Sequence, residues 1–403
     1  MSLIVQKYGG SSVASLDHLR RVAARIAKTR EAGHDVVVVV SAMGKMTSEL
    51  LGRAQSLTSE PEPRELDMLL SAGERISMSL LAMALGELGL DAISLTGVQA
   101  GIYTDETHFN ARIRNVDAAR VREELGHGRV VVVAGYQGLT PAGEVATLGR
   151  GGSDTTAVAL AAALEAERCE ICSDVDGIYS ADPRVVPEAM RIDRMAYEDM
   201  LALARHGARV LNARAVEYAR ETATPVFAVS TFSDTGGTLV NRHERKAGGA
   251  VGIAAHGGLV RVQWQAHAEE DTLAQALAVL ELNEPFHYRA SPVHGGGMHH
   301  EMLVPVEQLS EPDGCGERLN EHFKAEVTAS NTMGSVSVVG PGVENDEDTR
   351  RRFTARLADF ECLPRQWLEA PDALSCLLPE SSIDSATQVL HEEFIRPARK
   401  AAA

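Results

Sequence analysis

A regular alternation of apolar runs and helical patterns over residues 1–240 constrains the fold of this chain more than any other feature. Residues 36–40 are five consecutive valines, a run typical of a parallel strand that is covered on both faces. We expect further strands at the apolar segments 91–95, 130–134, 169–172 and 225–229. Helical patterns fill most of the intervals, including 16–30, 68–90, 116–124, 157–166 and 197–205. This rhythm predicts the α/β class and a sandwich architecture, but it does not give the order of the strands.

The segment 147–157, TLGRGGSDTTA, is the strongest functional signal. It follows the apolar run 130–134 and opens the alanine-rich helical stretch, so it combines a strand, a glycine turn and a helix start. That geometry presents backbone N–H groups to a phosphate or a carboxylate. The turn also carries a cation (Arg150), a hydroxyl (Ser153) and an anion (Asp154), which a turn used only for packing does not need. We therefore predict an anion-binding site here.

A second glycine turn of this kind lies near the N-terminus, in LIVQKYGGSSV (3–13). Lys7 stands at the end of the expected strand, where the turn opens. The glycine spacing is not that of a Walker A loop, and no third glycine completes a dinucleotide fingerprint. With Lys7 on one turn and Arg150 on the other, the sequence predicts two anions bound close together.

Composition limits the class of protein and its partners. The chain has 403 residues, enough for two or three domains, and 44% of them are hydrophobic, which predicts a full core. A formal net charge of −17 argues against nucleic acid as a partner, because phosphates would be repelled. No stretch is expected to reach the length of a membrane span, and no signal peptide is recognisable at the N-terminus. We therefore expect a cytoplasmic protein without a membrane partner.

The cysteines and histidines were considered as metal or redox sites. Five cysteines without a signal peptide favour free thiols, Cys362 among them. Cys169 and Cys172 have the CxxC spacing, but they lie on an expected strand and no second pair exists, which argues against zinc or redox chemistry. His294, His299 and His300 lie in a glycine-rich stretch that we interpret as a solvated loop. No metal ligand is predicted.

The composition changes at the polar segment 241–249, NRHERKAGG, which we interpret as a linker. Beyond it, strand and helix patterns alternate in two successive sets. The first set is 259–266, 272–282, 302–305 and 315–324, and the second is 334–340, 347–357, 373–378 and 385–394. This arrangement suggests a repeated βαββαβ-like module. The predicted domains are therefore 1–243, 250–325 and 326–403.

Seven short stretches, in order along the chain, resemble aspartate kinases of the amino-acid kinase superfamily. They are VQKYGGSSV (5–13), VSAMG (40–44), SAGER (71–75), TLGRGGSD (147–154), SDVDGIY (173–179), DPR (182–184) and GARVL (207–211). The resemblance implies a three-layer α/β sandwich of the amino-acid kinase type, followed by two ACT-like, ferredoxin-like modules. It also implies transfer of the ATP γ-phosphoryl group to the β-carboxylate of L-aspartate, giving 4-phospho-L-aspartate. This is the first step towards lysine, threonine and methionine.

The resemblance assigns roles to residues of both glycine turns. Lys7 would be the main cation at the β- and γ-phosphates, and Asp154 would orient it rather than take a proton. The remaining phosphate-binding residues of the turns would be Gly9, Gly10, Ser11, Gly151 and Gly152. Arg150 would hold the α-carboxylate of aspartate, since a guanidinium suits bidentate pairing. Glu74 would face the substrate ammonium, and Ser41, Thr47 and Ser153 would complete the substrate site.

The nucleotide side of the site and the metal are also implied by the resemblance. Ser173, Asp174, Tyr179 and Arg184 would cradle the nucleotide, together with Arg209. From the residues alone, the segment 173–184 is equally well interpreted as strand and turn, because Asp-Pro dipeptides simply favour turns. A Mg²⁺ ion would accompany ATP, held mainly by phosphates and water.

Some positions depart from the family pattern. Where the family has GAKVLH, this chain has Arg209 and Asn212, so nucleotide contacts there are expected to differ. We expect neither residue to touch Lys7, Arg150 or Asp154. In the C-terminal modules, segments 283–290, 294–300 and 365–370 do not resemble the usual effector-binding strands and turns. We therefore expect inhibition by lysine or threonine to be weakened, altered or lost.

Two alternatives remain open from the sequence. One is another amino-acid kinase that makes an acyl phosphate, acting on glutamate or N-acetylglutamate. Arg150, Glu74 and the ACT-like tail argue against it, since Glu74 would lack an ammonium partner in an acetylated substrate. The other is a non-catalytic amino-acid sensor on a kinase fold, against which the intact Lys7, Arg150, Ser153 and Asp154 argue. Because ACT modules generally pair through their sheets, we expect a homodimer formed by the C-terminal region, with an amino-acid effector as a further partner.

Overall fold

The computed structural model describes residues 2–233, 236–245, 249–267, 272–280, 282, 285–293, 297–309, 314–323, 327–360 and 364–395. Asn283, His294 and Cys362, which the sequence analysis discussed, lie outside these residues. The chain forms two compact units. The first comprises Met1–Ile178, Arg191–Leu201 and Arg209–Glu244, and the second comprises Tyr179–Met190, Ala202–Ala208 and Arg245–Ala403. The three domain boundaries drawn from the sequence stay a prediction.

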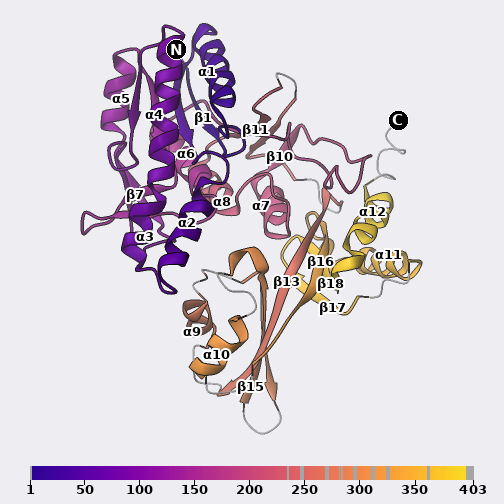
Figure 1. Ribbon diagram of the computed structural model, residues 1–403. Coiled ribbons are helices and arrows are strands. Elements are labelled where there is room, and N and C mark those ends of the chain that lie inside the picture. The colour runs from indigo at the N-terminus through magenta and orange to yellow at the C-terminus, as the bar shows by residue number, and fades with distance from the viewer. Residues whose placement is uncertain are drawn as a thin grey trace, which may run out of the picture. The chain divides into compact units, whose positions relative to one another are not determined.

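The first unit is built on an eight-stranded sheet (Figure 1). The order of its strands is β10 (Arg194–Ala196), β12 (Thr238–Asn241), β11 (Val226–Ser230), β9 (Arg168–Ser173), β1 (Leu3–Tyr8), β2 (Asp35–Val40), β6 (Val130–Ala134) and β3 (Ala92–Leu95). The central strands β11, β9, β1, β2, β6 and β3 run parallel to their neighbours, whereas β12 is antiparallel to β11. Because each of these parallel strands ends in the same direction, their carboxyl ends lie along one edge of the sheet.

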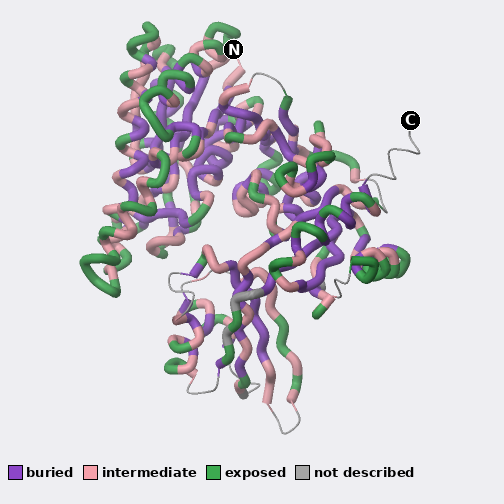
Figure 2. Tube along the Cα trace, turned by 45° about the vertical axis from the view of Figure 1, so that its right-hand side comes forward, coloured by how far each residue is buried: buried purple, intermediate pink, exposed green. Residues whose placement is uncertain are grey.

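Helices cover both faces of this sheet, which confirms the α/β class and the three-layer sandwich. On one face, α1 (Leu16–Glu31) and α4 (Ala72–Glu87) pack against Val36, Val38 and Val40. Helix α6 (Gly152–Ala163) packs against β1, β2 and β9. It also contacts α8 (Ala213–Thr222). All five valines of 36–40 are fully buried, as the continuous β-branched run predicted. Figure 2 shows the buried residues of the chain in purple. The other helices that begin in this unit are α2 (Met46–Leu57), α3 (Pro63–Leu70), α5 (Ala119–Gly126) and α7 (Tyr197–Arg205).

The helix expected over 68–90 is divided into α3 and α4 at Ser71. Ser71 is fully buried, and its carbonyl accepts a hydrogen bond from the side-chain amide of Gln137 (3.1 Å), which offers that carbonyl a partner outside the helix. By length and composition, the stretch Pro63–Glu87 is apolar enough to span a membrane, contrary to the sequence expectation. In the structure, however, Met78, Leu81 and Leu85 of this stretch belong to the hydrophobic core beside the sheet.

A small four-stranded sheet accompanies the large one in the first unit. Its order is β5 (Ile113–Val116), β4 (Ile102–Thr104), β7 (Gln137–Leu139) and β8 (Val145–Thr147). Strand β8 leads directly into the second glycine turn, which therefore does not follow the central strand β6 as the sequence analysis assumed. The two segments are nevertheless joined, because Gln137, three residues beyond β6, pairs with Thr147. The helix after the turn begins at Gly152 rather than at residue 157.

The second unit contains a six-stranded antiparallel sheet with helices, the ferredoxin-like arrangement expected of ACT-like modules. Its order is β14 (His287–Val293), β15 (Gly297–Pro305), β13 (Gly252–His267), β16 (Thr328–Val339), β18 (Ala373–Pro379) and β17 (Gln366–Ala370). Strand β14 was missed because HYRASPV alternates only weakly between apolar and polar residues. Short 3₁₀ helices lie at Val306–Gln308, Val343–Asn345 and Glu380–Ser382.

Two of the hydrophobic clusters on this sheet include helices. One contains Val260, Trp264 and residues of α9 (Thr272–Val279) and α10 (Cys315–Phe323). The other contains Ile253, Phe353 and residues of α11 (Glu347–Ala358) and α12 (Ile383–Phe394). The long strand β13 thus contributes to both clusters, and its register shifts between them, beside Gly258.

Candidate active site

Four chain segments leave the carboxyl edge of the central sheet next to one another. They follow β1, β2, β6 and β9, and begin with Gly9, Ser41, Gly135 and Asp174 respectively. In open α/β sheets, ligands bind in the crevice outside the carboxyl ends of the strands. Several residues assigned from the sequence belong to these segments or to the strand ends that precede them, namely Lys7, Gly9, Gly10, Ser11, Ser41, Ser173 and Asp174.

Lys7 and Asp154 form the ion pair at the centre of this edge. The ammonium of Lys7, on β1, lies 2.6 Å from a carboxylate oxygen of Asp154, in the first turn of α6. The two side chains are only 13% and 12% exposed, so solvent screens the pair little. A partly buried ion pair of this kind holds a flexible lysine in one place. The residues that the sequence analysis named as catalytic are thus in direct contact.

The first glycine turn packs tightly against the segment that follows β2. A Cβ atom on Gly10 would lie 3.0 Å from the carbonyl oxygens of Ala42 and Gly44, and the N–H of Gly44 donates to the carbonyl of Gly10. The hydroxyl of Ser12, a residue not considered from the sequence, lies 2.6 Å from that of Thr231 and fixes the other side of the turn. Ser11 is exposed, whereas Ser12 is buried. The turn is therefore closely packed, and a side chain at residue 10 would crowd these two carbonyl oxygens.

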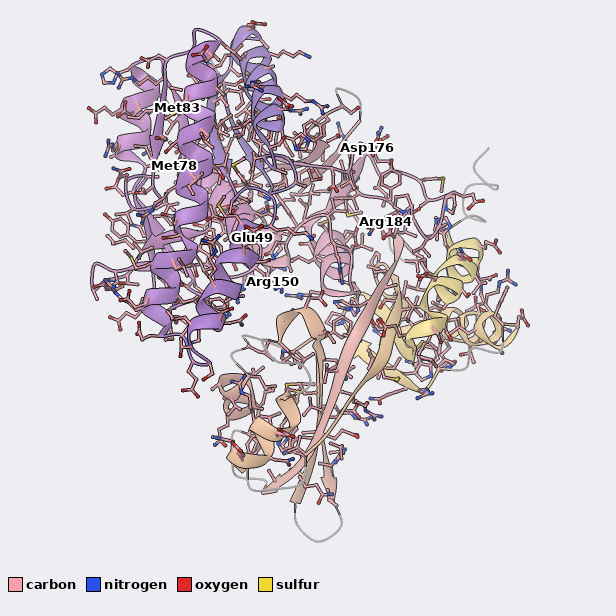
Figure 3. All side chains as sticks on the ribbon, in the orientation of Figure 1. Glu49, Met78, Met83, Arg150, Asp176 and Arg184 are labelled. Carbon is pink, nitrogen blue, oxygen red and sulfur yellow. The ribbon has the colours of Figure 1, made fainter. Side chains whose placement is uncertain are left out.

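The second glycine turn contains two residues in the left-handed region, Gly149 (φ +72°) and Gly151 (φ +71°), on either side of Arg150. Gly151 is the N-cap of α6, whose first-turn residues Gly152, Ser153 and Asp154 are buried. The positive end of the helix dipole therefore lies at this turn, where it favours an anion. Arg150 itself is exposed, and Figure 3 labels it.

Glu74 lies in the first turn of α4 and is only 3% exposed. One carboxylate oxygen accepts a hydrogen bond from the N–H of Ala42 (3.0 Å). Among the described residues, the other oxygen, Oε2, has no hydrogen-bond partner. Burial raises the pKa of this carboxyl group to about 7. Because an unpartnered buried carboxylate is costly, the arrangement suits a cationic ligand such as an ammonium group.

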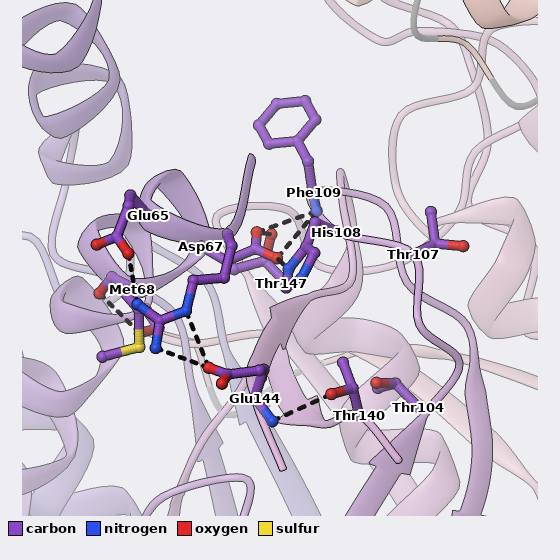
Figure 4. A network of polar contacts seen from close by, with 12 residues as sticks. Glu65, Asp67, Met68, Thr104, Thr107, His108, Phe109, Thr140, Glu144 and Thr147 are labelled. Atoms are coloured by element: carbon purple, nitrogen blue, oxygen red, sulfur yellow. Dashed lines mark hydrogen bonds and ion pairs between the residues drawn. The ribbon is translucent and has the colours of Figure 1, made fainter. Parts of the chain in front are cut away.

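A network around Asp67 holds the strand that leads into the second glycine turn (Figure 4). Asp67, on α3, is fully buried and accepts hydrogen bonds from the N–H of Phe109 and the hydroxyl of Thr147. Its other oxygen lies 2.7 Å from Nδ1 of His108. These residues were not identified from the sequence. The available signal was a lone carboxylate within the apolar helical run DMLL (67–70).

Asn212 contradicts the expectation that it would not touch Arg150. Its side-chain amide donates to the carbonyl oxygen of Arg150 (3.2 Å), and its Oδ1 accepts from the N–H groups of Arg214 and Ala215. At this position, the sequence-based expectation rested only on the loss of a titratable group. An asparagine just before a helical pattern is, however, a known N-cap signal.

The other assigned residues of the first unit have simpler surroundings. The N–H of Ser41 donates to the carbonyl of Tyr8, and Thr47 lies in the first turn of α2. Ser173 ends β9, with its hydroxyl near the N–H of Val175. Asp174 and Arg209 are exposed.

Tyr179 and Arg184 belong to the second compact unit, whereas the other residues assigned from the sequence belong to the first, so their nucleotide contacts stay a prediction. The guanidinium of Arg184, labelled in Figure 3, binds the carboxylate of Asp182 and is 83% exposed. The segment 179–190 is joined to the C-terminal part of its unit by hydrogen bonds. The N–H of Ile253 donates to the carbonyl of Ser180, and the hydroxyl of Ser180 lies 2.9 Å from Nε2 of His391.

Cys169, Cys172 and His300 are buried within strands. Cys169 and Cys172 are buried in β9, where burial raises the pKa of the Cys172 thiol to about 12 and that of Cys169 well above its usual value. The prediction of a solvated loop around His300 is wrong. This residue lies on β15 and is only 5% exposed, and its Nδ1 lies 2.7 Å from the hydroxyl of Tyr288. Within the described part of the chain, no group of three or more His, Cys, Asp or Glu side chains is arranged to hold a metal ion.

Comparison with known proteins agrees with this fold. The model of the amino acid kinase family matches residues 2–230, more than half of the chain. The first unit therefore has the fold of an amino acid kinase. A curated aspartokinase of Corynebacterium glutamicum is 42% identical over 412 residues, covering 98% of this chain and 96% of that protein. The chain belongs to the aspartokinase family.

Solved structures extend the likeness over both units. Escherichia coli aspartokinase III, in complex with aspartate and ADP, has a TM-score of 0.79 at 23% identity and covers 97% of this chain and 99% of that one. At this identity, the likeness concerns the fold. The aspartate kinase of Synechocystis is 32% identical with a TM-score of 0.56, and the match covers 97% of this chain and 69% of that chain.

Proposed function

We propose that this protein transfers the γ-phosphoryl group of ATP to the β-carboxylate of L-aspartate, giving ADP and 4-phospho-L-aspartate. The observation that carries the proposal is the buried pair of Lys7 and Asp154 between two glycine turns, with the unpartnered oxygen of Glu74 in the same unit. The cation and open amides suit phosphate, and the buried carboxylate suits the ammonium of an amino acid. Both ligands are anions overall, so their approach depends on this distribution of charge.

The attacking group needs no general base, because a carboxylate is already ionised at neutral pH. Catalysis consists of positioning the two anions in line and stabilising charge on the transferring phosphoryl group. Lys7 supplies positive charge at the β- and γ-phosphates, and Asp154 holds its ammonium in place. The glycine turns bring backbone N–H groups close to the phosphates, with Gly9, Gly10 and Ser11 on one turn and Gly151 on the other. The N–H of Gly152, also assigned from the sequence, instead donates to the carbonyl of Gly149 (3.0 Å).

The α-carboxylate and the ammonium group of the aspartate each bind a side chain of opposite charge. Arg150 pairs with the α-carboxylate, and Glu74 pairs with the ammonium through its unpartnered oxygen. Ser41, Thr47 and Ser153 add hydrogen bonds. Ser173, Asp174 and Arg209 of the first unit contact the nucleotide.

Magnesium accompanies the nucleotide in this proposal. The ion would be held mainly by phosphate oxygens and water, which suits the reluctance of Mg²⁺ to lose its waters. When bound, it neutralises charge on the β- and γ-phosphates. The protein residues then bind and orient the two substrates.

The second unit is proposed to act in regulation and assembly. Its ACT-like modules, 250–325 and 326–403, would bind an amino-acid effector and form a cytoplasmic homodimer. Because the expected effector-binding segments depart from the family pattern, we propose that inhibition by lysine and threonine is weak or lost. Activity measured with each amino acid at millimolar concentration tests this, and strong inhibition by lysine plus threonine contradicts it.

ADP release from ATP and Mg²⁺, measured with a panel of acceptors, tests the catalytic proposal. L-Aspartate is expected to support turnover, whereas L-glutamate and N-acetyl-L-aspartate are expected to be poor acceptors. The acetylated compound is the sharper comparison, because it keeps both carboxylates and removes the ammonium that Glu74 would bind. Equal turnover with the two aspartates would contradict the proposed role of Glu74. Absence of turnover with every acceptor would favour a non-catalytic sensor.

A further inference from the structure

Asn212 joins the N-termini of two helices in the first unit. Its Oδ1 caps α8 by accepting from the N–H of Arg214 at 3.0 Å and from that of Ala215 at 3.4 Å. Its Nδ2 donates to the carbonyl of Arg150, in the turn that starts α6. An asparagine side chain has both an acceptor and a donor at its end, so one residue can hold both positions.

The second glycine turn leaves no free space beside this amide. A Cβ atom on Gly151 would lie 2.1 Å from Nδ2 of Asn212 and 2.2 Å from its Cγ. Gly151 therefore combines a left-handed backbone with direct contact to the Asn212 side chain. The carbonyl of Arg150, which belongs to the peptide group shared with Gly151, is consequently fixed by packing as well as by the hydrogen bond.

The other side of Arg150 is held by the same helix through a second asparagine. A Cβ atom on Gly149 would lie 2.5 Å from Oδ1 of Asn110. That oxygen accepts a hydrogen bond from Nη1 of Arg214, at 2.8 Å. Residues 212 and 214 of the α8 N-terminus thus fix the backbone on both sides of Arg150, directly at Gly151 and through Asn110 at Gly149.

We propose that Asn212 is a positioning residue, which sets the backbone of Arg150 so that its guanidinium meets the α-carboxylate of the amino-acid substrate. The inference rests on the proposed function only in naming that substrate. Asn212 contacts the turn and not the reacting atoms. Its loss therefore weakens binding of the amino acid, and it affects ATP binding and the turnover number little.

Asn212→Asp separates positioning from helix capping. Aspartate is as good an N-cap as asparagine, so α8 keeps its acceptor. The variant loses the donor and turns a carboxylate oxygen toward the carbonyl of Arg150. Loss of one hydrogen bond predicts a rise in KM for aspartate of about 3- to 12-fold, and repulsion adds to it. Asn212→Ser, which keeps a cap but cannot span the distance, is expected to raise KM without the added charge.

Asp346→Ala is the matched control, since it removes the side-chain N-cap of α11 in the other unit. It is expected to lower stability and leave KM unchanged. Hydrogen exchange in the peptide 148–155 gives a readout independent of activity, and it is expected to be faster in both Asn212 variants but not in the control. Wild-type KM together with wild-type exchange in Asn212→Asp would overturn the inference. Failure of the wild type to use aspartate would instead contradict the proposed function, with the exchange result still deciding whether Asn212 holds the turn.

Discussion

Replacing Glu74 by glutamine separates the cost of burying a carboxylate from its use in binding. Glutamine has nearly the same shape and keeps an oxygen that can accept from the N–H of Ala42. What it removes is the charge of a group that is only 3% exposed. The variant is therefore expected to fold more stably at alkaline pH and to bind aspartate less well.

The magnitude follows from the pKa of Glu74, which burial raises from 4.5 to about 7. Since the folded-state pKa is raised, ionising this carboxyl costs stability. The stabilising contribution of the neutral Glu74 carboxyl group to the free energy of unfolding is complete below the pKa of the unfolded state. This contribution is lost as the pH rises through about 7, the pKa of the folded state. At 1.36 kcal/mol per pKa unit, the loss at pH 8 amounts to about 3 kcal/mol. Glu74→Gln avoids this loss.

Substrate binding has the opposite dependence on pH. Only ionised Glu74 pairs with an ammonium group, so KM for aspartate in the wild type is expected to fall as pH rises through about 7. At pH 8, KM for aspartate is expected to be about 100-fold higher in Glu74→Gln than in the wild type, because a buried charge partner has been lost. In this variant, KM is also expected to be nearly independent of pH. The turnover number should change less than KM.

Urea unfolding and steady-state kinetics at pH 5, 6, 7 and 8 measure both effects. Glu87→Gln, at the exposed end of the same helix, is the control and should change neither quantity. Equal stability of wild type and Glu74→Gln at pH 8 would refute the argument from burial. An unchanged KM for aspartate would refute the assignment of the ammonium partner.

Substitutions at Lys7, Asp154, Arg150 and Asp67 test other parts of the site. Lys7→Met should lower the turnover number by at least about 1000-fold and cost about 3 kcal/mol, since Asp154 is left unpaired; adding Asp154→Asn should restore stability but not activity. Arg150→Lys should raise KM for aspartate by about 10-fold with little change in turnover, because bidentate pairing is lost. Asp67→Asn should destabilise the protein by about 2 kcal/mol, because one acceptor of its buried network becomes a donor.

A specific result would contradict each of these three predictions. Substantial turnover by Lys7→Met would mean that the phosphate cation lies elsewhere. If Arg150→Lys changed KM for ATP instead of aspartate, Arg150 would belong to the nucleotide half of the site. An Asp67→Asn protein with wild-type unfolding would show that the network in Figure 4 contributes little to the stability of the turn.

Local patterns predicted much of the fold because they follow from the chain itself. The five valines of 36–40 indicated a fully covered strand, and all five are buried. Glycine pairs at strand ends indicated the two turns, and the charged residues beside them, Lys7 and Asp154, proved to be partners. The break at Ser71 was not predictable, since it involves a hydrogen bond from Gln137, 66 residues away.

The positioning residues were missed for the same reason. Asp67 and Thr147 are 80 residues apart, and Asn212 and Arg150 are 62 residues apart. No spacing rule connects such positions, because their contact depends on how α3, α6 and α8 pack. A buried aspartate or an N-cap asparagine is visible in the sequence, but its partner becomes visible only in the folded chain.

Trapping the product with hydroxylamine tests the central claim most directly, namely that two glycine turns and their cations bring a carboxylate to the γ-phosphate. With ATP, Mg²⁺ and L-aspartate, the wild type is predicted to form the hydroxamate of aspartate in step with ADP, and Lys7→Met is predicted to form neither. Release of ADP without hydroxamate, or equal hydroxamate from the Lys7 variant, would contradict the account.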